Sequence, residues 1–132
     1  MGAWGAGPWE NDGALDLLAE VGDGGLVVED LAWAFEDEYL EVDGGQIALA
    51  LVDLALAVRG LRPVPGDLDL DRVAPAFTPE VVAWVAEQAD RALAGPETSE
   101  AYELWEEAGS LDEWRLPAVA ALAELRASSP TP

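Results

Sequence analysis

The sequence predicts an all-α protein: a single compact domain of five or six helices around a central apolar helix. Three observations favour this fold class. Apolar residues recur at helical spacing, capping residues and prolines separate the periodic segments, and the stretch from Ile47 to Val58 is apolar except for Asp53. A helix that is apolar on every side packs inside a protein. The predicted domain covers residues 1–127, and residues 128–132 are predicted to form a disordered tail.

The central helix is expected over residues 44–59. Asp43 and Gln46 precede its apolar part with the spacing of a capping box, in which each side chain accepts a hydrogen bond from a free backbone N–H at the start of the helix. Gly60 suits the left-handed backbone that often follows a helix, and Pro63 prevents continuation. The apolar part is shorter than the roughly 20 residues that a transmembrane helix needs, so we expect no membrane partner.

Asp53 is the exception in the central helix, and it is a candidate site residue. A buried carboxylate must pair with a cation, accept hydrogen bonds or take up a proton. One interpretation is structural, a pair with an arginine for which Arg91 is the candidate. The other is functional, a ligand or catalytic acid that faces a cleft. The structural interpretation is favoured because buried networks of this kind are common.

The remaining helices are predicted from their caps and periodicity. Asn11 is an N-cap for a helix over residues 12–21, with Leu15, Leu18 and Val21 on its buried side. The other predicted helices span residues 28–40, Thr78 to Leu93, Ser99 to Ala108, and Ser110 onward, with a proline-rich loop at 60–78. In the helix at 28–40, Tyr39 lies on the predicted buried stripe, whereas Trp33 lies off it and is a candidate for partner binding.

An irregular arm, rich in glycine and tryptophan, is predicted for residues 1–11. Glycines in it permit backbone conformations and close approaches that other residues would not. Trp4 and Trp9 are large apolar anchors that we expect to hold the arm against the helical body.

The opening MGAWGAGPWENDGALD resembles a bacterial family that begins Met-Gly-x-Trp-Gly-x-Gly-x-Phe-x-Asn-Asp-x-Ala-x-Asp, known as domain of unknown function 4259. Trp9 replaces the usual phenylalanine, an aromatic-for-aromatic change. The positions that match are Gly2, Trp4, Gly5, Gly7, Asn11, Asp12, Ala14 and Asp16. The resemblance continues through the helix of Asp53 and the segment SEAYELWEEAG, and it implies a related fold without implying an activity.

The charge of the chain is strongly negative. Twenty-seven acidic residues face six arginines, which gives a net charge of −21 with no lysine. Such a surface repels nucleic-acid phosphates, so we expect no nucleic-acid partner, but it attracts a basic protein. Histidine and cysteine are absent, which excludes histidine-based catalytic triads and thiol chemistry. The first residues lack the pattern of a signal peptide, so a cytoplasmic location is expected.

The predicted function is a non-enzymatic protein-interaction module, antidote-like or regulatory, that masks a basic partner. The alternative is a carboxylate-based metal-binding protein or enzyme that uses Asp12, Asp16 and Asp53, the first two of which share one helix face. No cofactor and no catalytic residue are predicted. The predicted binding residues are Trp4, Trp9, Asn11, Asp12, Asp16, Trp33 and Asp53.

Overall fold

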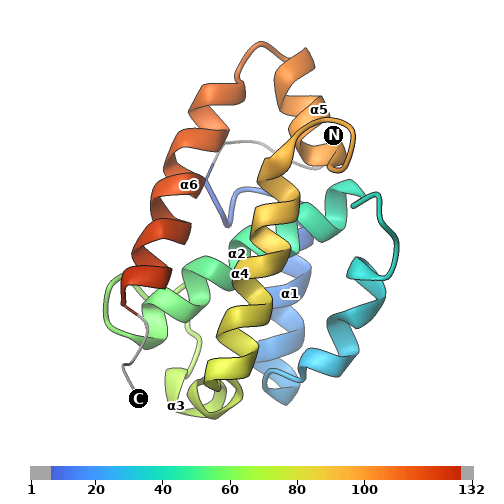
Figure 1. Ribbon diagram of the computed structural model, residues 1–132. Helices are drawn as coiled ribbons and strands as arrows, with labels where there is room; N and C mark the ends of the chain where they lie inside the picture. The colour runs from blue at the N-terminus through green and yellow to red at the C-terminus, as the bar shows by residue number, and fades with distance from the viewer. Residues whose placement is uncertain (1–6, 129–132) are drawn as a thin grey trace.

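A computed structural model describes residues 7–128, apart from the side chains of residues 23 and 24 (Figure 1). The described residues form six α-helices and two 3₁₀ helices and no strand, which confirms the all-α prediction. In chain order the elements are α1 (Asp12–Gly24), η1 (Val28–Phe35), α2 (Val42–Val58), α3 (Leu70–Val73), η2 (Ala74–Ala76), α4 (Pro79–Ala94), α5 (Glu100–Glu107) and α6 (Leu111–Ala127).

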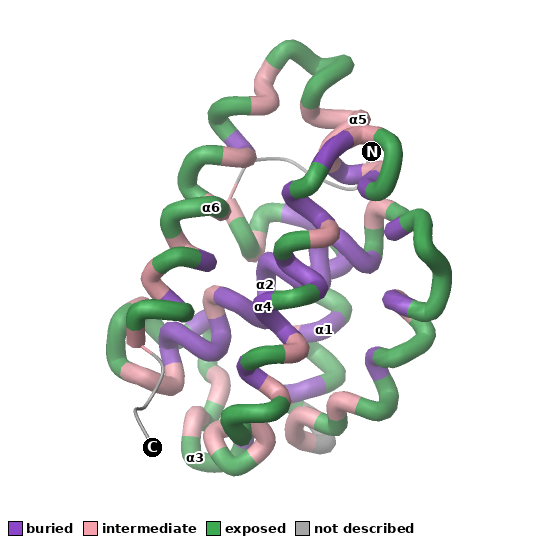
Figure 2. Tube along the Cα trace, viewed as in Figure 1, coloured by how far each residue is buried: buried purple, intermediate pink, exposed green. Residues whose placement is uncertain are grey.

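Helix α2 is the centre of the protein, as its apolar sequence predicts. It packs against α1, α4, α5 and α6, and Figure 2 shows it buried along most of its length. Residues 44–52 and 54–57 are buried, so Asp53 is the single interruption of the buried run from 44 to 57. The other helices therefore bury their apolar sides against a common partner, and the site described below is built around this interruption.

The capping box predicted at the start of α2 is wrong. The helix begins at Val42 with Glu41 as its N-cap, and no side chain of the cap bonds to the helix. Other elements satisfy the groups involved: Gln46 Oε1 accepts the backbone N–H of Gly13 in α1 at 3.0 Å, and the N–H of Val42 donates to Glu100 Oε1 of α5 at 2.8 Å. Contacts with α1 and α5 therefore replace the local cap. The spacing of residues within one helix does not predict contacts of this kind.

The end of α2 follows the prediction and positions a key arginine. Gly60 has a φ of 76°, which is the left-handed conformation that favours glycine. Its N–H donates to the Ala57 carbonyl at 3.0 Å, and the N–H of Leu61 donates to the Leu56 carbonyl at 2.9 Å. These two bonds form a Schellman motif, and the chain that leaves it brings Arg62 back beside α2.

Helix α1 begins where predicted, but its buried side is rotated. Asn11 Oδ1 accepts the N–H of Ala14 at 2.8 Å, which confirms Asn11 as the N-cap. Leu17 is buried, whereas Leu15, which we expected on the buried side, is 40% exposed. Both leucines fit the helical repeat that contains Ala14 and Val21. Which of the two is buried therefore depends on how α1 packs against α2.

The helix predicted over residues 28–40 is shorter than expected. Its regular part is the 3₁₀ helix η1, and the chain then runs irregularly to Leu40. Arg91 of α4 donates to the carbonyl oxygens of Phe35, Asp37 and Glu38, so contacts with α4 hold this segment in an irregular path. As a result Tyr39, predicted to be buried, is 40% exposed.

In the second half of the chain two predicted caps form, at α4 and α5, whereas the side chain of Ser110 makes no cap hydrogen bond at the start of α6. Thr78 Oγ1 accepts the N–H of Val81 at the start of α4, and Ser99 Oγ accepts the N–H of Tyr102 at the start of α5. Of the predicted tail, only Ser128 is described, and its hydroxyl accepts a hydrogen bond from Arg59 at 2.7 Å. None of the helices in the described part of the chain is both long enough and apolar enough to cross a bilayer.

Candidate functional site

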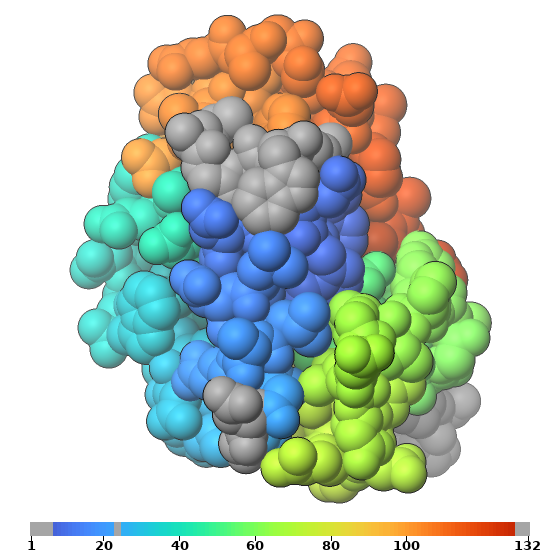
Figure 3. Space-filling model, turned by 180° about the vertical axis from the view of Figure 1, so that it is seen from behind, coloured from blue at the N-terminus to red at the C-terminus, as the bar shows by residue number. Residues whose placement is uncertain are grey.

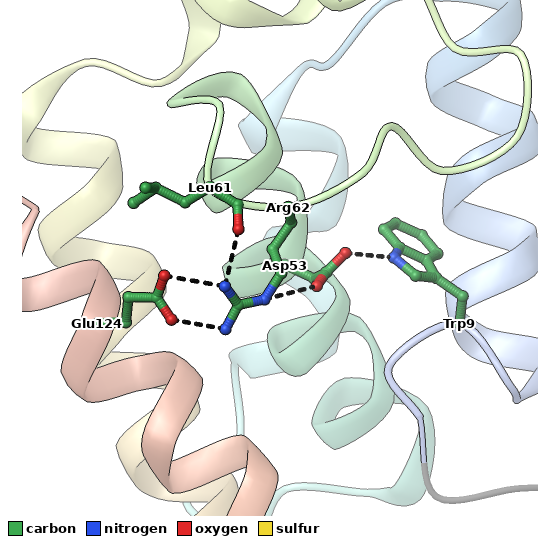
Figure 4. A network of polar contacts seen from close by, with 5 residues as sticks. All are labelled: Trp9, Asp53, Leu61, Arg62 and Glu124. Carbon is green, nitrogen blue, oxygen red and sulfur yellow. Dashed lines mark hydrogen bonds and ion pairs between the residues drawn. The ribbon is translucent and has the colours of Figure 1, made fainter.

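Asp53 lies at the centre of a polar network that links three parts of the chain (Figure 4). Its Oδ2 accepts the indole N–H of Trp9 at 2.7 Å. Its Oδ1 lies 3.9 Å from Nε of Arg62, and the carboxylate side chain is 15% exposed. The prediction that Asp53 is shielded and paired with an arginine is therefore confirmed, and the N-terminal arm supplies its hydrogen-bond donor.

Arg62 connects Asp53 to helix α6. Its two Nη atoms donate to the two carboxylate oxygens of Glu124 at 2.9 and 2.7 Å. The hydrogen bond from Arg62, opposed by partial desolvation, lowers the pKa of Glu124, and the same bond raises the pKa of Arg62. The prediction that Arg91 pairs with Asp53 is wrong. The guanidinium of Arg91 donates instead to Gln88 Oε1 at 2.6 Å and to backbone carbonyls.

A cavity of about 250 Å³ opens beside this network, between the start of α1, helix α2 and helix α6. Asp53 lines it, so the carboxylate is a structural pair and also faces a cleft. The cavity is lined by Gly7, Pro8, Asn11, Gln46, Leu49, Val52, Asp53, Arg62, Glu113, Trp114, Pro117, Ala118 and Ala121. Its walls are mainly apolar, and its polar groups lie on α2, on the loop after α2, on the chain before α1 and at the start of α6.

Two buried amides contribute to the wall of the cavity. Asn11 is 7% exposed, and its Oδ1 caps α1 while its Nδ2 lies 3.4 Å from the Pro8 carbonyl. Gln46 is 8% exposed, and its Oε1 accepts from Gly13. Among the described residues, nothing accepts a hydrogen bond from Gln46 Nε2. This amide therefore keeps an unused donor at the cavity.

A second hollow, of about 100 Å³, lies on the surface between η1 and the start of α2. We call it the acidic-aromatic hollow, and its lining residues are Trp33, Ala34, Asp37, Tyr39, Glu41, Asp43 and Gly44. Trp33 is 59% exposed and Tyr39 is 40% exposed. The hollow therefore presents two aromatic rings and three carboxylates to solvent. In Figure 3 the segment from η1 to α2 is cyan, at the edge of the face whose middle is α1.

Bonds from α4 and α5 fix the loop that carries this hollow. Arg91 holds the backbone of residues 35–38. Leu40 donates its N–H to the Thr98 carbonyl at 2.8 Å and accepts the N–H of Glu100 at 2.9 Å. The hydroxyl of Tyr39 donates to Glu103 Oε2 at 3.3 Å. Partial shielding from water and the neighbouring Glu103 raise the pKa of Tyr39, so the phenol remains protonated at neutral pH.

The structure does not gather the three acids of the metal-binding alternative. Asp12 and Asp16 are exposed on α1, and neither lines the cavity that Asp53 faces. No three acidic side chains in the described ranges lie close enough together to hold a metal ion. Trp4 lies outside the described residues. Trp9 is half-buried against the core and belongs to the Asp53 network.

Several residues of these two sites were missed by sequence reasoning. Gln46 was assigned to a cap and Tyr39 to a buried stripe. Arg62 and Trp114 reach the cavity from segments distant in sequence, so no local pattern identifies them. The one signal in the sequence for the acidic-aromatic hollow was Trp33, which lies off the buried stripe of its predicted helix.

Comparisons with known proteins give a family and no activity. No curated protein and no solved structure matches the chain. The family model described as a domain of unknown function (DUF4259) matches residues 2–116, which is most of the 132-residue chain. The match includes α1 to α5, the Asp53 network except Glu124, and the acidic-aromatic hollow. The chain therefore belongs to the DUF4259 family.

Proposed function

We propose that the protein is a non-enzymatic interaction module, antidote-like or regulatory, that masks a basic segment of a partner protein at the acidic-aromatic hollow. The observation that carries this proposal is the exposure of Trp33, 59% of whose surface is accessible, above a hollow lined by Asp37, Glu41 and Asp43. A large indole beside three carboxylates is suited to an arginine or lysine side chain.

Two interactions favour a basic occupant. A cation over the face of an indole gains roughly 0.5–1 kcal/mol at an exposed site and about 2 kcal/mol when water is excluded. The carboxylates add charge attraction, and the net charge of −21 steers a basic partner toward the protein from a distance. Tryptophan and tyrosine are also the residue types that most often dominate the binding energy of an interface.

The hollow is organised before any partner binds. The hydrogen bonds of Arg91 to the Asp37 carbonyl and of the Leu40 backbone to Thr98 and Glu100 fix the segment that carries Asp37 and Tyr39. Gly44 forms part of the wall of the hollow, and the absence of a side chain there lets η1 approach α2 closely, since a Cβ would lie 2.6 Å from the Ala34 carbonyl oxygen. Preorganisation reduces the entropic cost of binding. This favours the hollow over the exposed acids of α1 as the binding site.

The test compares two triple variants that remove the same number of charges. One carries Asp37→Asn, Glu41→Gln and Asp43→Asn in the hollow. The matched control carries Asp12→Asn, Asp16→Asn and Glu20→Gln on the exposed side of α1. Binding of a short peptide of alternating arginine and alanine is measured by calorimetry at about 50 mM and about 300 mM salt, because screening weakens steering over this range.

We expect the hollow variant to bind the peptide at least about tenfold more weakly than the α1 variant. Trp33→Ala, which keeps every charge, is expected to weaken binding to a similar degree without lowering the melting temperature. Equal weakening by the two triple variants, with no effect of Trp33→Ala, would mean that the peptide responds to net charge alone and would refute the proposed hollow.

A further inference from the structure

We propose that the cavity beside Asp53 binds a small organic cation, a protonated amine carried on an apolar body. This inference is independent of the proposed function, because the cavity shares no lining residue with the acidic-aromatic hollow. A ligand could therefore occupy the cavity while a basic protein segment occupies the hollow.

The size and lining of the cavity set the class of ligand. Its volume of about 250 Å³ is slightly below the range of about 300–1,000 Å³ found for drug-sized ligands. Leu49 and Val52 of α2 and Trp114, Pro117 and Ala118 of α6 form apolar walls. A compact molecule with a ring or short hydrocarbon body fits such walls, and a larger or fully polar molecule does not.

The charges around the cavity favour a cation. Asp53 and Glu113 line it, and Arg62 is the cation among its lining residues. The charge of Arg62 is already engaged, because Glu124 binds both of its Nη atoms. The cavity is therefore lined by two carboxylates and by one guanidinium that Glu124 already neutralises, so the local charge is negative and an anionic ligand is repelled.

Two polar atoms have capacity for the ligand. Asp53 Oδ1 lies 3.9 Å from Arg62 Nε, which is too long for a hydrogen bond, so this oxygen can accept from an ammonium group. Gln46 Nε2, on a side chain 92% buried, has no acceptor in the described part of the chain. An acceptor on the ligand, or water, can therefore receive a hydrogen bond from this amide.

The two polar anchors are held in position. Trp9 donates to the other oxygen of Asp53, and Gly13 donates to the other end of the Gln46 amide. Trp114 is 6% exposed, stacks on Trp105 with ring centroids 6.4 Å apart, and contacts Tyr102 edge to face. The walls and the polar groups therefore need little rearrangement to receive a ligand.

The experiment uses three probes of the same shape: 2-phenylethylamine, 2-phenylethanol and phenylacetate, which are a cation, a neutral alcohol and an anion. Binding to the full chain is followed by NMR, with the indole N–H resonance of Trp9 as the reporter because it donates to Asp53. We expect saturable binding of the amine, about tenfold weaker binding of the alcohol, and no binding of the anion.

Two pairs of variants locate the site. Asp53→Asn is expected to abolish the preference for the amine, whereas Asp16→Asn, an equal charge change on the exposed side of α1, is expected to preserve it. Ala118→Leu fills the cavity without touching a polar group and is expected to prevent binding, whereas Ala123→Leu on the exposed side of α6 is not. Each variant is first checked for a native spectrum.

The proposal is overturned if no probe binds at millimolar concentration, if the anion binds as well as the amine, or if Ala118→Leu leaves amine binding intact. Failure of these measurements would leave the proposed function standing, because peptide binding at the acidic-aromatic hollow is measured separately. Equal weakening of peptide binding by the two triple variants, which would refute the hollow, would in turn leave the cavity proposal standing.

Discussion

Asp53 shows how a carboxylate is accommodated in an otherwise apolar helix. One oxygen receives the indole N–H of Trp9, and the guanidinium of Arg62 lies near the other. Arg62 is itself compensated by Glu124, so neither charge depends on one partner. Because the Arg62 side chain is 30% exposed, its ion pairs are weakened by solvent, and the hydrogen bond from Trp9 is the better shielded contact.

The first prediction is that Trp9→Phe destabilises the protein. The substitution keeps an aromatic ring but removes the donor to Asp53, and an unsatisfied, partly buried charged group costs roughly 1–3 kcal/mol or more. The measurement is the urea midpoint at neutral pH. The matched control is Trp84→Phe, because Trp84 is also half-buried and its indole N–H donates to no group within residues 7–128. Equal losses in the two variants would show that ring area, and not the hydrogen bond, matters.

At the scale of the elements, local signals predicted most helix starts. Asn11, Thr78 and Ser99 all cap helices as expected, because a cap bonds to a backbone group only two or three residues away. The capping box at Gln46 failed because Gly13 of α1 uses its amide oxygen. The helix at 28–40 was overextended because Arg91 of α4 binds the carbonyls of its last turn. Both errors come from contacts made across the fold.

The same distinction explains the candidate sites. Asp53 and Trp33 could be identified from the sequence because each departs from the pattern of its own helix. Arg62 and Trp114 could not, because they reach the cavity from the loop after α2 and from α6. Periodicity shows which residue is unusual within an element, but it does not show which residues of other elements will face it.

The second prediction concerns the close approach of η1 and α2. Gly44 is buried, and a Cβ there would lie 2.6 Å from both the Ala34 carbonyl oxygen and Leu40 Cδ1. Since a backbone carbonyl cannot rotate away as a side chain can, we expect Gly44→Ala to cost about 1–3 kcal/mol and to weaken peptide binding at the hollow. Thermal unfolding and the peptide titration measure the two effects.

Gly22 provides the control for this prediction. It lies in α1, and a Cβ there would meet nothing within 4 Å. Gly22→Ala should therefore stabilise the protein by about 0.5–1 kcal/mol, through the lower entropy of the unfolded chain and the higher helix propensity of alanine. A Gly44→Ala variant as stable as Gly22→Ala would mean that η1 and α2 are not held as closely as described.

At the scale of the whole molecule, charge opposes folding. The net charge is −21, while the ion pairs among the described side chains are Arg62 with Asp53 and Glu124, and Arg126 with Asp90. Repulsion between the remaining acids destabilises the compact state. The apolar core around α2, whose buried residues Figure 2 marks in purple, has to outweigh this repulsion.

The third prediction follows from this balance. Raising sodium chloride from about 10 mM to about 500 mM shortens the Debye length from about 30 Å to a few ångström. Screening weakens repulsion among many acids more than it weakens the few ion pairs, so the melting temperature should rise. Calorimetry at several concentrations checks this, with potassium chloride as a second salt. A melting temperature that falls with both salts would show that attractive pairs outweigh repulsion.

The central claim, that a basic segment binds at the acidic-aromatic hollow, is tested most directly by the indole N–H resonance of Trp33 during titration with the arginine–alanine peptide. Trp33→Phe identifies this resonance. We expect it to shift and saturate with the binding curve, while the resonances of Trp84 and Trp114 stay in place. An unchanged Trp33 resonance in a titration that shifts the backbone of α1 would place the peptide elsewhere and contradict the claim.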